Sequence, residues 1–462
     1  MAKTRSQIEQ EFLQAFSDNM ANPVNMDKLA VGYHSFMGAM NLVVEDGLAV
    51  YDPTQPYGVV WDDNQDTYSR VGHSIPAIQR QMRRVVCNGN PMFGGTLYKY
   101  LNSENSSLFE DGSDATSYVT GAAGGNYQVF VEIPKYYYKA YKVGSLNYNI
   151  ISLTKFDGSK TRDMFKTANW ADSGDGSDEA HEVSYGYISA FEGVLYDDSE
   201  SELVDGTGDN DNTDNIETGA DKILSVAGYK PYSGITRDES RLMIVNGASK
   251  QFDWHRYEVM VELHLVEFAT HDSQSTIAGY TQNTSSPSYT NDVLHTGLTL
   301  SLGNNSGSIS GSAQHTAGGG DGNFDGVVAN SYRGIENFYG HLWQWVDAVN
   351  FTDHRPYTCA IVGAFEDDKF DGDYLRTIDA DGVEITQPSD NGYQSTLQSG
   401  SMFIKSIGAS SATKITDYYY QDSGNRVLRS GGRLDDSSLA GVSFLIANDA
   451  SSNSAWIICC RA

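Results

Sequence analysis

The sequence contains little cysteine, little proline and few basic residues, and it has no long apolar run. Only 4 cysteines and 10 prolines occur among its 462 residues. The chain has 31 Lys and Arg but 60 Asp and Glu, which gives a formal net charge of −29. A membrane-spanning helix needs roughly 18 or more consecutive apolar residues, so insertion into a membrane is not expected. Nucleic-acid binding needs a basic stripe, and none is visible, which excludes nucleic acid as a partner.

The four cysteines lack the spacing of metal ligands and do not predict a disulfide framework. They are Cys87, Cys359, Cys459 and Cys460. Adjacent cysteines seldom bridge each other without strain, so we expect four buried thiols. A redox pair at Cys459–Cys460 is the alternative, and Arg461 is the only basic neighbour that could activate it.

The N-terminal sequence lacks the apolar core of a signal peptide, so we expect synthesis in a cytosol. Thr4 and Gln7 form a capping-box pattern, and Pro23 ends the helical pattern that follows. An isolated short amphipathic helix is not stable, so its apolar stripe must meet another surface. We expect residues 1–50 to anchor or oligomerise the chain, with a docked N-terminal hairpin as the alternative. The anchoring stripe consists of Ile8, Phe12, Leu13 and Phe16.

After this segment, strand and helix patterns predict a loop-rich α+β fold. Glycine is abundant (46), and tyrosine (29) outnumbers phenylalanine (18), which suits β structure with half-buried rings. Residues 127–133 alternate as a strand does, and residues 254–270 carry an apolar stripe typical of a core helix. Trp343 and Trp345 are expected on one face of a strand, in the core.

We therefore predict a short N-terminal helical segment followed by one large domain with insertions. Residues 1–50 form the anchoring segment, residues 51–126 a β-rich connecting region, and residues 127–462 the main domain. No cofactor is expected. The acidic residues 197–214 alternate Asp, Asn and Gly and could wrap a Ca²⁺ ion, but their spacing does not match the twelve-residue calcium loop. A solvated surface insertion is the favoured interpretation.

Three segments together resemble a known family. GIENFYGHLWQWVD (residues 334–347) resembles the G-N-x-W-E-W signature of the formylglycine-generating-enzyme branch of the C-type lectin fold. Residues 426–462 resemble the closing R-V-x-R-G-G pattern of that branch, and residues 129–136 its opening strand, which ends in Ile-Pro. The arrangement looks like bacteriophage virion adhesins with this fold, whose closing segment is sometimes the target of diversity-generating retroelements. The resemblance covers residues 57–462.

The sequence departs from the family pattern at informative positions. Leu434 stands where the family has Trp, Gln344 where it has Glu, and Cys459–Cys460 where it has Gly-Phe. Changes in exposed loops are what a variable binding face would show. The enzyme branch also needs a pair of active-site cysteines, and only Cys359 lies in that region. We therefore expect no enzymatic activity.

The resemblance implies a structural protein of the virion, made in the host cytoplasm. It would be a fibre or spike subunit of head or tail, homotrimeric, bound to other virion proteins through its N-terminus. Its closing loops would bind a glycan or protein of the host surface. The expected ligand-binding residues are Leu434, Asp435, Asp436, Ser437, Ser438, Leu439, Asp449, Ser451, Ser452, Asn453 and Trp456.

Two alternatives remain open at this point. The first is an oxidase or another metal-dependent enzyme of the same fold, with His341, His354, Asp347 and Asp353 as candidate ligands. The second is a purely structural decoration protein, whose closing face contacts neighbouring subunits instead of a host.

Overall fold

The fold is dominated by strands, so the predicted α+β class is wrong. In the computed structural model, 39% of the described residues lie in strands and 13% in helices. The physical reason is that short apolar runs broken by glycine-rich turns favour strands, and few described segments carry a helical stripe long enough to bury. The residues that the structure describes are 43–45, 49–51, 54–65, 67–124, 126–166, 182–206, 217–270, 293–310, 328–359, 361, 364–434, 436, 439–455 and 457–462.

The predicted N-terminal helical segment lies outside the described residues, as do Ile8, Phe12, Leu13 and Phe16. From the anchoring range, the structure describes a two-stranded antiparallel sheet of β1 (Val43–Glu45) and β2 (Ala49–Tyr51).

Two sheets are built from the first half of the chain. The five-stranded sheet contains, in order, β10 (Lys160–Thr161), β8 (Tyr137–Val143), β9 (Leu146–Ser152), β3 (Tyr57–Asp62) and β4 (Tyr68–Val71). The four-stranded sheet contains β11 (Tyr185–Ser189), β7 (Tyr127–Pro134), β5 (Arg83–Asn88) and β6 (Thr96–Tyr100). Strand β7 confirms the strand predicted at 127–133. Because β3 pairs with β9 and β5 with β7, the ranges 51–126 and 127–462 share both sheets.

Two small three-stranded sheets follow. One contains β13 (Glu202–Val204), β12 (Val194–Asp197) and β14 (Lys222–Leu224). The other contains β15 (Gly307–Ser310), β16 (Val328–Tyr332) and β17 (Ile335–Glu336).

The C-terminal part of the chain forms the largest sheet. Its order is β20 (Tyr374–Arg376), β19 (Arg355–Cys359), β18 (Trp343–Thr352), β24 (Asn425–Ser430), β25 (Leu445–Asp449), β23 (Tyr418–Gln421), β21 (Gly392–Leu397) and β22 (Ile404–Ile407). The last strand, β26 (Ile458–Cys459), pairs in parallel with the start of β18. Strand β18 is therefore the meeting point of the 334–347 motif and the closing segment.

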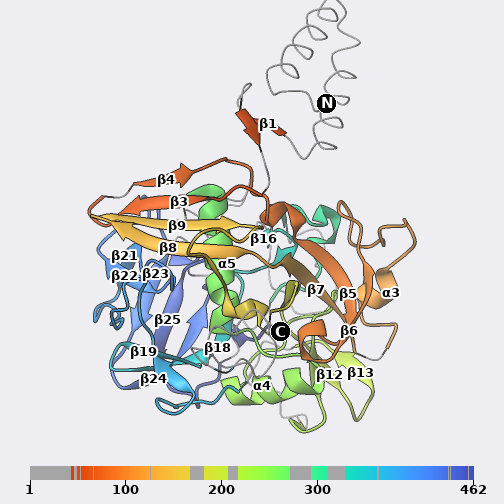
Figure 1. The fold of residues 1–462 in the computed structure, drawn as a ribbon. Helices are drawn as coiled ribbons and strands as arrows, with labels where there is room; N and C mark the ends of the chain where they lie inside the picture. The colour runs from red at the N-terminus through yellow and green to blue at the C-terminus, as the bar shows by residue number, and fades with distance from the viewer. Residues whose placement is uncertain are drawn as a thin grey trace, which may run out of the picture.

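Helix α5 (Trp254–Phe268) lies at the centre of the molecule and confirms the predicted core helix. Asp253 caps its first turn by accepting from the backbone N–H of Arg256. In Figure 1 the helix runs between the sheet that contains β3, β8 and β9 and the blue strands of the large sheet, and it contacts both β3 and β18. Its apolar side chains join one continuous core that extends from Tyr57 to Ala447.

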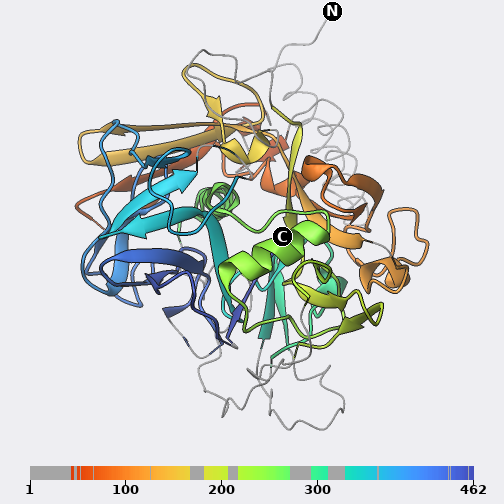
Figure 2. The same ribbon diagram turned by 90° about the horizontal axis from the view of Figure 1, so that it is seen from below.

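The other two described α-helices are α3 (Thr116–Val119) and α4 (Arg237–Asn246). The sequence reasoning did not predict α4, although Thr236 and Glu239 form a complete capping box at its start. Figure 2 shows α4 crossing the lower side of the molecule beside the C-terminus. Met243 and Ile244 of α4 share a small apolar cluster with Cys460 and Ala462. No helix within the described ranges is long and apolar enough to cross a membrane.

Candidate functional site

The closing segment packs Arg429 of β24 against the two tryptophans of β18. The register pairs Trp345 with Arg429, and the guanidinium carbon of Arg429 lies 4.1 Å from the ring centre of Trp343 and 5.9 Å from that of Trp345. Arg429 also forms an ion pair with Asp449 and donates to Oδ1 of Asn448 at 3.3 Å. Burial lowers the pKa of Arg429 to about 10 and raises the pKa of Asp449, so both charges are held away from water.

Trp343 and Trp345 share a side, as predicted, but they differ in exposure. Trp345 is fully buried and donates its indole N–H to the carbonyl oxygen of Ile235 at 3.0 Å. Trp343 is half-buried, so the prediction that both belong to the core is confirmed only for Trp345.

Asp436 fixes the orientation of Trp343. The indole Nε1 of Trp343 donates to Oδ2 of Asp436 at 2.8 Å, and the same oxygen accepts the backbone N–H of Arg433 at 2.8 Å. The guanidinium of Arg433 lies 4.8 Å from the ring centre of Trp343. Trp343 therefore presents a partly exposed ring that is held between two arginines and one carboxylate. We call the group Trp343, Arg429, Arg433, Asp436 and Asp449 the closing face.

Tyrosines that the sequence reasoning overlooked extend this face across the sheet. Tyr418 and Tyr420 of β23 are half-buried, and their ring centres lie 4.6 Å apart. Tyr393 of β21 follows at 5.0 Å from Tyr418. The row ends next to the closing face, because Tyr420 pairs with Ile446 of β25 and Ile446 pairs with Arg429. Burial and the carboxylate of Asp436 raise the pKa of Tyr420. The signal was the run Tyr418-Tyr-Tyr-Gln421, because alternate strand residues share a face.

The predicted ligand-binding residues do not all face solvent. Leu434 is only 5% exposed and packs in an apolar cluster beneath the loop, so it supports the closing face from inside. Leu439 is half-buried. The partners of Leu434 in that cluster are Leu294, Leu298 and Ala329.

Polar contacts hold the second predicted loop, which contains Ser451, Ser452 and Asn453. Asn453 donates to Oδ1 of Asp449 at 2.7 Å, and the hydroxyl of Ser451 donates to Oδ2 of Asp368 at 2.5 Å. Ser452 is exposed. The predicted residues that lie outside the described part of the chain are Asp435, Ser437, Ser438 and Trp456.

Two of the residues considered for a metal site, His341 and Asp347, are engaged in other contacts. His341 is buried, its Nδ1 lies 2.5 Å from Oε2 of Glu192, and its Nε2 accepts the backbone N–H of Leu294 at 3.0 Å. These two contacts fix the tautomer with the proton on Nδ1. Of the residues described, no three or more His, Cys, Asp or Glu side chains form a group that could hold a metal ion.

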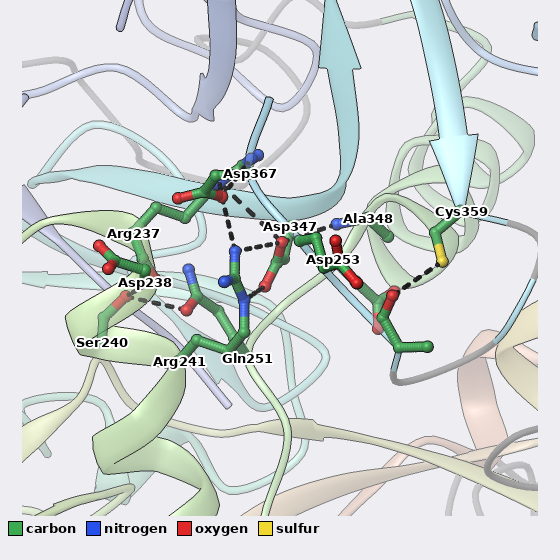
Figure 3. A network of polar contacts seen from close by, with 12 residues as sticks. Arg237, Asp238, Ser240, Arg241, Gln251, Asp253, Asp347, Ala348, Cys359 and Asp367 are labelled. Atoms are coloured by element: carbon green, nitrogen blue, oxygen red, sulfur yellow. Dashed lines mark hydrogen bonds and ion pairs between the residues drawn. The ribbon is translucent and has the colours of Figure 1, made fainter. Parts of the chain in front are cut away.

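Asp347 belongs to a network that joins α4 to β18 (Figure 3). Arg241 donates to both carboxylate oxygens of Asp347, at 2.5 and 3.0 Å. Arg237 and Arg241 also pair with Asp367, at 2.5 and 2.7 Å. Burial raises the pKa of Asp367, but the two arginines outweigh it and the net shift is downward. This network keeps the carboxylates of Asp347 and Asp367 paired with arginines inside the fold.

The four cysteines are free and buried, as predicted. Burial raises the pKa of Cys459 and Cys460, and burial also raises the pKa of Cys359 to about 12. A reactive thiol needs a depressed pKa, so the geometry does not favour a redox pair at Cys459–Cys460.

Comparison with known proteins leaves the chain without a family assignment. No protein-family model matches it, and no curated protein matches its sequence. The function is therefore argued from the closing face and from the resemblance of its motifs.

Proposed function

We propose that the protein is a bacteriophage virion protein that binds a saccharide of the host surface through the closing face. The observation that carries the proposal is the half-buried ring of Trp343, which Asp436, Arg429 and Arg433 hold in one orientation. A fixed aromatic ring offers a stacking plane to the C–H face of a sugar at little entropic cost. Carboxylates and guanidinium groups beside it offer directional hydrogen bonds to hydroxyl or acidic groups.

The row of Tyr393, Tyr418 and Tyr420 supports a glycan rather than a compact ligand. Three partly exposed rings in succession, on strands of the same sheet as Trp343, provide an extended platform on which consecutive sugar units can stack. Such contacts are weak one by one, so a fibre or spike would gain affinity from several copies. We propose a homotrimer anchored in the particle through residues 1–50, on the resemblance to virion adhesins.

The test is the binding of purified full-length protein to intact host cells and to their isolated surface polysaccharide. Trp343→Ala should lower the affinity at least about tenfold, because it removes the stacking plane and leaves Asp436 and the arginines without their central partner. Tyr141→Ala is a suitable control, since Tyr141 is also partly exposed but lies on β8. Unchanged binding of a folded Trp343→Ala variant would overturn the site.

A structural decoration protein is the competing function. It predicts that the protein is incorporated into particles yet binds neither host cells nor their polysaccharide. Binding that trypsin treatment of the host cells abolishes, while the isolated polysaccharide remains unbound, would instead point to a protein receptor.

A further inference from the structure

The four charged side chains of the closing face differ in their accessibility. The side chain of Arg429 is 4% exposed, and that of its partner Asp449 is 16% exposed. The side chain of Asp436 is 9% exposed, whereas that of Arg433 is 31% exposed. The formal charges of these four groups cancel, but they are not presented equally. Among them, a ligand can touch the side chain of Arg433 most readily.

The backbone of Arg433 is fixed, so its side chain starts from a defined position. Its N–H donates to Oδ2 of Asp436 at 2.8 Å, and its carbonyl oxygen accepts the N–H of Asp436 at 3.1 Å. The next residue, Leu434, donates its N–H to the carbonyl oxygen of His341 at 3.0 Å. Since all three hydrogen bonds are made by the backbone on this side, replacing the Arg433 side chain leaves them in place.

The guanidinium of Arg433 lies beside the ring that the proposed function assigns to the saccharide. Its central carbon is 4.8 Å from the ring centre of Trp343, and its Nε is 3.8 Å from Oδ1 of Asp436. The second distance is longer than a hydrogen bond, so Asp436 attracts the guanidinium without a close ion pair. Arginine can contact an aromatic ring and pair with a carboxylate at the same time, because its N–H donors lie in the guanidinium plane.

An accessible guanidinium is a distinctive feature on so acidic a chain. The net charge of −29 repels anions in general, so an anion is held only where a cationic group is close. A sugar hydroxyl would form an ordinary hydrogen bond with Arg433. A carboxylate would form charge-assisted bonds, which are roughly twice as strong and can be bidentate. Arg433 therefore favours a ligand that carries a carboxylate.

We propose that the closing face binds an acidic saccharide, whose carboxylate pairs with Arg433 while a sugar ring rests against Trp343. The inference rests on the proposed function, because it names the class of saccharide that the same face takes. Uronic acids and sialic acids both offer such a carboxylate. The class is thus defined by the charged group that Arg433 recognises.

The experiment measures the binding of purified full-length protein to the isolated surface polysaccharide of the host, before and after its carboxyl groups are reduced to alcohols. Activation with a carbodiimide followed by borohydride removes the charge and leaves the glycosidic linkages intact. We expect the protein to bind the native polysaccharide at least about tenfold more tightly than the reduced one. Equal binding of the two forms would overturn the proposal.

Arg433→Gln tests the residue itself. This variant should lose at least about tenfold in affinity for the native polysaccharide and should bind the two forms equally. Arg433→Lys should keep part of the preference, because an ammonium group retains the charge but not the fork of donors. A preference for the native form that survives undiminished in folded Arg433→Gln would contradict the assignment.

Arg426→Gln is the matched control, and it should keep the full preference. Arg426 also belongs to the closing segment, its side chain is 22% exposed, and it pairs with the exposed carboxylate of Asp422 at 3.2 Å. An equal loss of preference in Arg426→Gln and Arg433→Gln would show that any positive charge on this surface suffices, and the specific role of Arg433 would be wrong.

Trp343→Ala separates this inference from the proposed function. If that variant binds the native polysaccharide as tightly as the wild type does, or if the wild type binds neither form, the closing face is not the site and both proposals fail. If Trp343→Ala weakens binding of both forms while the wild type does not distinguish them, the closing face remains the site and only the acidic class is excluded.

Discussion

Glu258 is the described carboxyl whose environment most clearly predicts an effect of pH. Burial raises its pKa from 4.5 to about 7, against the opposing influence of Arg162 and His255. Between these two values the folded protein retains a proton that the unfolded chain releases. The free energy of unfolding contributed by this group is thus fully present below pH 4.5 and is lost as the pH rises to 7. The change amounts to about 3 kcal/mol at most.

Glu258→Gln should remove this dependence, because the amide does not titrate. In urea unfolding between pH 5 and pH 8, the variant should gain stability relative to the wild type by about 1–3 kcal/mol as the pH rises. Glu200→Gln serves as the control, since Glu200 is exposed on a turn. Parallel curves for the wild type and Glu258→Gln would contradict the prediction.

The residues of the candidate site could be predicted from the sequence only in part. The sequence pattern correctly indicated that Trp343 and Trp345 share one face of a strand. It could not tell which of the two is covered, because that depends on β24 and β26, which come from much later in the chain. For the same reason Leu434 looked exposed in a polar loop, whereas Leu294 and Leu298, distant in sequence, bury it.

Local sequence patterns predicted the elements whose structure depends mainly on residues close together in the chain. Helix α5 has a long apolar stripe and an Asp cap, and strand β7 alternates cleanly, so both were found. Helix α4 is short and has exposed Leu242 and Val245 on its surface, so its stripe is weak, and only its capping box indicates it. The α+β class failed because it gave too much weight to helices and too little to the many short strands.

The bulge in β18 depends on a side chain from α4. Ala348 has a φ of +62°, and the pairing of β18 with β24 shifts between Val346 and Asn350. Arg237 donates to the carbonyl oxygens of Val346 and Val349 at 3.1 and 2.9 Å. Because the guanidinium takes the place of missing ladder bonds, α4 stabilises the strand that presents Trp343.

Arg237→Met should therefore destabilise the protein by about 3 kcal/mol or more, because it leaves two buried carbonyls without their donor and removes one of the two arginines that pair with Asp367. Urea denaturation measures the loss, and faster amide hydrogen exchange in β18 and β24 locates it. Leu242→Ala on the exposed side of the same helix should cost well under 1 kcal/mol. A similar loss for both variants would show that α4 matters only as a helix.

At the scale of the whole molecule, the order of the strands within each sheet could not be predicted from sequence patterns. Strand β18 pairs with β24, about eighty residues later, and β23 pairs in parallel with β25. Periodicity indicates which face of a strand is buried but not which strand lies beside it. In the structure the 334–347 motif and the closing segment meet, because β26 pairs in parallel with the start of β18.

Arg461 is the residue through which the end of the chain joins three sheets. It is fully buried, and burial lowers the pKa of its guanidinium. It donates to the carbonyl oxygen of Ser189 in β11 at 2.8 Å and to that of Glu336 in β17 at 2.6 Å. It also donates to Oε1 of Gln344 in β18 at 3.1 Å. One side chain thus satisfies acceptors on three strands that belong to three different sheets.

Arg461→Met should lower the free energy of unfolding by about 3–5 kcal/mol, because three buried acceptors lose their donor at once. Arg461→Lys should recover less than half of this, since an ammonium group cannot reach acceptors in three directions with the geometry of a guanidinium. The measurement is urea unfolding followed by tryptophan fluorescence, with Arg80→Met as the control at an exposed arginine. A full rescue by lysine would show that only the charge is needed. The loss that we predict instead requires the planar fork of donors, by which the last residues of the chain hold the closing face against the rest of the molecule.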